Sequence, residues 1–119
     1  MKIIDRIFAW ILVIGGVLHG WGSCHMYRNE PMTMLWSICA TLLTLLIAAV
    51  NLLRVQRPGD CPLAWISFAG SLSWAVAAFA AGVLIHNIFD PRPMTHWVTG
   101  LVLAGFSLRA ALKPGSVNA

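Results

Sequence analysis

Residues 31–53 read PMTMLWSICATLLTLLIAAVNLL, a run that contains no charged side chain. A helix rises about 1.5 Å per residue, so this run exceeds the roughly 20 apolar residues that a helix needs to cross a bilayer. Pro31 suits the first turn of such a helix, because proline lacks the N–H group that the first turn leaves unpaired. The stretch therefore predicts a transmembrane helix.

Charged residues separate three further runs without charge, residues 7–27, 61–89 and 93–108. With their flanks trimmed or extended to the nearest turn signals, we predict helices at about residues 3–23, 31–53, 61–86 and 91–112. The three connections are short, so neighbouring helices should run antiparallel. The predicted fold is all-α: one integral membrane domain, residues 1–119, built as an up-down-up-down four-helix transmembrane bundle.

The composition excludes two other classes of protein. Hydrophobic residues make up 59% of the chain and charged residues 10%, whereas about 25% charged residues is usual in soluble domains. Too few charges are present to cover a soluble surface. The net charge of +4 comes from scattered residues without a basic run, which argues against nucleic acid as a partner. The expected environment is the lipid bilayer.

The distribution of basic residues predicts the orientation of the helices. Cytoplasmic loops of membrane proteins carry an excess of Lys and Arg. The prediction is therefore a multi-pass protein of the inner (plasma) membrane with both termini in the cytoplasm. The expected inner side carries six basic residues, Lys2, Arg6, Arg54, Arg57, Arg109 and Lys113, and the outer side carries Arg28 and Arg92.

Soft metal-binding side chains gather on the expected outer side. Thiolates and thioethers favour Cu(I), and imidazole also suits copper. One hypothesis is therefore an outer copper site, and the alternative is that these residue types are simply tolerated at a membrane interface. The candidate ligands are Cys24, His25, Met26, Met32, Met34 and Met94.

A second hypothesis is a haem b held by two histidines. His19 and His96 should lie at similar depths in the first and fourth helices, and His86 is a substitute for either. Glycines one turn from both histidines would give a flat macrocycle clearance beside its axial ligands. The alternative is that each histidine is hydrogen-bonded across a helix pair and binds no cofactor.

Most other polar residues fit helix packing. Small and polar residues recur every three or four positions on one face of the second helix: Ser37, Thr41, Thr44, Ala48 and Asn51. Hydroxyls and small residues at such spacing let helices approach closely. A substrate path is the alternative, but we expect no charged residue in the middle of the membrane. No serine, histidine and acid set can be assembled, which argues against an enzyme.

The end of the first helix reads IGGVLHGWG from Ile14 to Gly22. An apolar run that ends in His-Gly, here His19 and Gly20, resembles the DoxX-like family of small four-helix membrane proteins. Some of those proteins are associated with thiosulfate or quinone redox complexes. The resemblance covers one helix of four, and it implies a redox-associated membrane subunit without identifying a catalytic residue.

Three functional hypotheses follow. The first is a non-catalytic accessory subunit of a larger membrane complex, such as a redox complex. The second is the outer copper or haem b binding protein, and the third is a small oligomeric transporter or channel. The third helix also carries two faces of small residues, which predicts contact with another chain, either a second copy or a larger subunit. These faces are Ser73, Ala77 and Ala81, and Ser71, Ala75 and Ala78.

Overall fold

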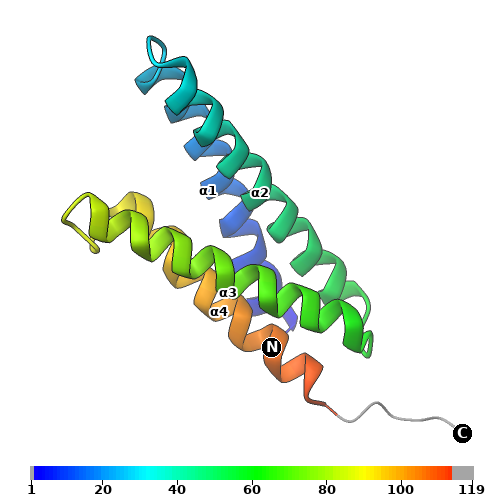
Figure 1. Cartoon of the computed structure of the whole chain (residues 1–119). Helices are drawn as coiled ribbons and strands as arrows, with labels where there is room; N and C mark the ends of the chain where they lie inside the picture. Colours follow the sequence, from blue (N-terminus) through cyan, green and yellow to red (C-terminus); the bar gives the residue numbers. More distant parts are fainter. Residues whose placement is uncertain (1, 114–119) are drawn as a thin grey trace, which may run out of the picture.

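The computed structural model describes residues 2–113 as four α-helices joined by short turns (Figure 1). The helices are α1 (Lys2–Met26), α2 (Pro31–Gln56), α3 (Cys61–Leu84) and α4 (Pro91–Ala111). The prediction of an all-α fold with four helices is confirmed. Both α1 and α2 extend about a turn beyond their predicted ends, so residues 24–26 and 54–56 are helical rather than in loops.

The helix starts follow from local capping. Proline occupies the first turn of α2, α3 and α4. The carboxylates of Asp60 and Asp90 accept hydrogen bonds from the backbone N–H groups of Leu63 and Arg92, each at 3.0 Å. Hydrogen bonds from the Arg92 side chain also lower the pKa of Asp90 to about 2. These caps satisfy N–H groups that a helix start otherwise leaves unpaired.

The end of α3 differs from the prediction by two residues. The helix ends at Leu84, because His86 adopts a left-handed backbone with a φ of 56°. The N–H of Asn87 then bonds back to the carbonyl of Gly82 at 2.9 Å. A left-handed residue with this backward bond is a common way to stop a helix.

The helices are arranged as two hairpins. We call α1 with α2 the first hairpin and α3 with α4 the second hairpin; most helix–helix contacts lie within them. Figure 1 shows that the hairpins approach each other near the turn between α2 and α3 and diverge towards the α1–α2 and α3–α4 turns. The junction of the hairpins therefore lies at one end of the molecule.

Polar side chains share the interior of this fold with a small apolar core, while many large apolar side chains are exposed. Thr44, Asn51 and Ser71 are fully buried, whereas Leu46 and Val76 are each more than 60% exposed. Large exposed apolar surfaces usually mark contact with a membrane or another protein. The helices α1, α2 and α3 are long and apolar enough to cross a membrane. The fourth predicted span, α4, is the least apolar helix and does not meet that criterion.

Candidate functional site

A buried ion pair lies where the two hairpins meet. The guanidinium of Arg54 on α2 donates to both carboxylate oxygens of Asp5 on α1, with Nη1 to Oδ2 at 3.0 Å and Nη2 to Oδ1 at 2.7 Å. The two side chains are only 5% and 10% exposed. A two-pronged contact of this kind fixes the geometry of both groups as well as neutralising their charges.

The ion pair extends into a network that includes all four helices. Arg54 Nε donates to Ser67 Oγ and Arg54 Nη2 to Asn51 Oδ1, both at 3.3 Å. Asn51 Nδ2 donates to Ser71 Oγ on α3 at 2.9 Å. The Ser107 hydroxyl on α4 lies within hydrogen-bond distance of both Ser67 Oγ and Asn51 Oδ1. We call these six residues the junction network: Asp5, Asn51, Arg54, Ser67, Ser71 and Ser107.

The junction network joins the two hairpins through buried hydrogen bonds that extend from an ion pair. Burying two charges costs several kcal/mol per ion, and that cost is offset only when the geometry is good and the remaining donors and acceptors are satisfied. Here Arg54 also binds Asn51 and Ser67, so its donors are directed at partners on two helices. Asn51 in turn bonds α3, so the first hairpin is tied to the second.

This network was not predicted from the sequence, in which Arg54 has the position of an interfacial charge and Asp5 was not assigned to the core. The signal was present, because Arg54 follows Asn51 by three residues and continues the polar face of α2. Asp5 likewise precedes Ala9 by four residues on the buried face of α1. Because Arg54 is paired in the core, five other basic residues remain on the expected inner side, against two on the outer side.

The structure also brings His19 and His96 together. Their ring centroids are 6.0 Å apart and the ring planes are inclined at 79°. Trp74 on α3 packs against His96 in the same manner, with centroids 5.6 Å apart. These three residues, which we call the histidine cluster, link α1, α3 and α4.

The glycines near the histidines do not leave the clearance that the haem hypothesis needs. A methyl group built on Gly20 would lie 2.8 Å from Thr41 Cγ2, and one built on Gly16 would lie 3.1 Å from Thr44 Cγ2. One built on Gly100 would lie 3.0 Å from Ala75 Cβ. Neighbouring helices fill these spaces, so the glycines serve helix packing. His86, the substitute ligand, lies exposed in the turn after α3.

The predicted copper ligands lie on both hairpins. Cys24, His25 and Met26 form the end of α1, and Met32 and Met34 lie in the first turn of α2. The remaining candidate belongs to the start of α4, and the α3–α4 turn lies well away from the α1–α2 turn in Figure 1. Among residues 2–113, no three His, Cys, Asp or Glu side chains are placed to hold one metal ion. Met94, the sixth candidate ligand, therefore lies on the second hairpin.

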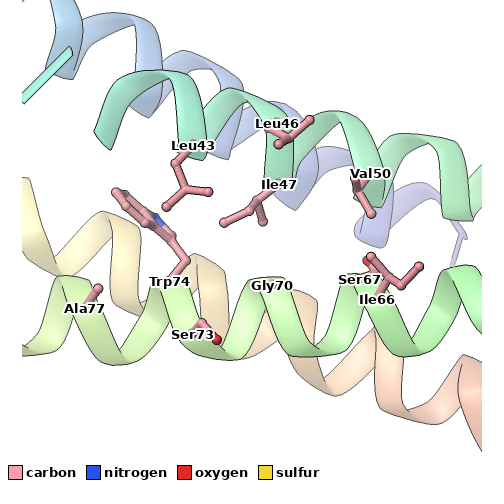
Figure 2. Close-up of a pocket in the computed structure, with 10 residues that line it drawn as sticks. All are labelled: Leu43, Leu46, Ile47, Val50, Ile66, Ser67, Gly70, Ser73, Trp74 and Ala77. Carbon is pink, nitrogen blue, oxygen red and sulfur yellow. The ribbon is translucent and has the colours of Figure 1, made fainter. Parts of the chain in front are cut away.

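A lateral groove of about 260 Å³ separates α2 from α3 (Figure 2). Its walls are almost entirely apolar, and Trp74 closes one end beneath Leu43. Ser73 and Ala77, from one of the predicted small-residue faces of α3, lie along its edge and are exposed. The groove is lined by Leu43, Leu46, Ile47, Val50, Ile66, Ser67, Gly70, Ser73, Trp74 and Ala77.

The chain matches no family model, no curated protein and no solved structure in comparisons of its sequence and fold. The likeness of the first helix to the DoxX-like family therefore stays a prediction.

Proposed function

We propose that the protein is a non-catalytic accessory subunit that packs against a larger partner in the inner (plasma) membrane. In this proposal the helices cross the bilayer up-down-up-down with both termini in the cytoplasm. The burial pattern supports the membrane location, because many large Leu, Ile, Val, Phe and Trp side chains are exposed along the helices. The basic excess on the side of both termini supports the orientation.

The observation that carries the proposal is the groove beside the exposed face of α3. Helices associate in membranes through small residues that let their backbones approach. The face made by Ser71, Ala75 and Ala78 is buried within the chain, whereas Ser73, Ala77 and Ala81 are exposed. The exposed face is therefore available to a transmembrane helix of a partner, which would bind in the groove between α2 and α3.

The junction network supports an assembly role in a second way. It binds the hairpins at one end only, through Asn51 and Arg54 on α2 and serines on the second hairpin. Buried bonds of this kind hold the hairpins at a set angle, and the groove keeps its shape. The polar groups in the junction network bond one another, which favours a structural function over a chemical one.

Bulky substitutions on α3 test the proposal. Ala77→Leu and Ala81→Leu should reduce co-purification of membrane partners from gently solubilised membranes, because leucine obstructs close helix approach. The matched control is Ala49→Leu, an exposed position on α2 that does not line the groove. Equal partner recovery from all three variants and the parent would contradict the proposal.

A further inference from the structure

The histidine cluster has a geometry that neither helix packing nor the junction network explains. His96 lies against Gly15 on α1: a methyl group built there would be 3.2 Å from Cε1, 3.5 Å from Nε2 and 3.8 Å from Nδ1 of the ring. These three atoms form the nitrogen-bearing edge of the imidazole. His96 therefore turns its nitrogens towards α1, and His19 lies one helical turn along α1 from Gly15.

One of these nitrogens is buried without a partner. Within residues 2–113, two buried side-chain nitrogens make no hydrogen bond to the protein, His96 Nδ1 and Trp74 Nε1, and both belong to the histidine cluster. Buried polar atoms normally have a partner. A nitrogen without one beside a second imidazole therefore favours an atom or ion that both rings bind. The 6.0 Å between the centroids is compatible with one atom bound by a nitrogen of each ring at about 2 Å.

We propose that His19 and His96 bind one monovalent copper ion, with Gly15 providing the space for the His96 ring. Imidazole is a good copper ligand, and Cu(I) is stable with two nitrogen ligands in a line. Two neutral imidazoles leave the full charge of the ion uncompensated. His19 is exposed and His96 is partly buried. A divalent ion such as Zn²⁺ would carry twice that charge without an anionic ligand to offset it, and it would need further ligands.

The site differs from both metal hypotheses drawn from the sequence. It uses the two histidines without a macrocycle, since the neighbouring glycine spaces are filled by other helices. It also uses none of the sulfur ligands near the α1–α2 turn. Trp74 packs edge to face on His96 and holds the ring in its orientation. The proposal is independent of any protein partner.

Anaerobic titration of the purified full-length protein with Cu(I), in competition with a chromophoric Cu(I) chelator, tests the site. We expect one ion per chain and nitrogen-only ligation in X-ray absorption spectra. His19→Gln and His96→Gln should each weaken binding at least about tenfold. The double variant should bind no more weakly than either single variant, because loss of one ligand already removes the site.

A glycine pair in the same helix gives a matched control that keeps both histidines. Gly15→Ala should weaken Cu(I) binding by crowding the His96 ring, whereas Gly22→Ala should not, because nothing lies within 4 Å of its added methyl group. Retained affinity in both glutamine variants would overturn the proposal. So would loss of binding in Cys24→Ala with sulfur ligation in the spectra, which would place the ion near the α1–α2 turn.

Discussion

At the scale of single residues, the role of Arg54 is evident only from its surroundings in the fold. In the sequence it follows an apolar run and has the position of an interfacial arginine. In the structure it is 5% exposed and binds Asp5, Asn51 and Ser67 on three helices. An arginine suits this position because its planar guanidinium directs several donors in fixed directions. Lysine could not bond three partners in the same geometry.

Removing one member of the ion pair should be strongly destabilising. Asp5→Ala leaves the Arg54 charge buried without its partner, and we expect the free energy of unfolding to fall by about 3–5 kcal/mol. Denaturant titration in detergent, followed by circular dichroism, measures this change. Glu30→Ala removes an exposed acid and should change stability by less than about 1 kcal/mol.

The double variant Asp5→Ala with Arg54→Met separates charge from packing. Removing both charges restores much of the loss if the unpaired guanidinium is its cause. A single Asp5→Ala variant as stable as Glu30→Ala would show that the pair contributes little.

At the scale of helices, the contact between α3 and α4 depends on one glycine. A methyl group built on Gly100 would lie 3.0 Å from both Ala75 Cβ and the Ser71 carbonyl oxygen. Backbone atoms cannot move aside as a flexible side chain can. The close approach of α3 to α4 therefore holds the least apolar helix against its neighbour and buries one small-residue face of α3.

Substitution of Gly100 tests this contact. Gly100→Ala should lower the free energy of unfolding by about 1–3 kcal/mol, since α3 and α4 must separate to admit the methyl group. Gly105→Ala in the same helix meets nothing within 4 Å and should be neutral, or stabilising by up to about 1 kcal/mol through helix propensity. Thermal unfolding in detergent distinguishes the two, and similar melting temperatures would argue against tight α3–α4 packing.

At the scale of the whole molecule, two hairpins joined at one end define both the groove and the histidine cluster. The junction network ties the end of α2 to α3 and α4, while the α1–α2 and α3–α4 turns diverge (Figure 1). The groove opens between α2 and α3, and the two histidines link α1 with α4. These surfaces depend on how the hairpins are set against each other, not on either hairpin alone.

The proposed orientation can be checked with reporter fusions. Fusions after Arg57 and at the C-terminus should report the cytoplasm, because most of the basic residues lie on that side. Fusions after Arg28 and after Asp90 should report the outer space and serve as the opposite control. A C-terminus on the outer side with Arg57 still in the cytoplasm would show that α4 does not cross the membrane, and both fusions on the outer side would reverse the proposed orientation.

Local features of the sequence were enough to predict four helices and where three of them begin. Proline and aspartate act within one turn of the residues that they cap, so Asp60 and Asp90 are informative without knowledge of the fold. Long apolar runs likewise predict membrane-length helices from composition alone. The end of α3 was harder to predict from the sequence, because histidine as a residue type gives no clear signal for the left-handed backbone of His86.

Tertiary structure alone decided which residues meet. Asp5 and Arg54 are 49 positions apart in the chain, and their contact depends on how α1 and α2 face each other. The same holds for the filled glycine spaces. Periodicity shows which residues share a helix face, but not which neighbour that face meets. That choice depends on the rotation and crossing of whole helices, which the packing of many side chains determines together.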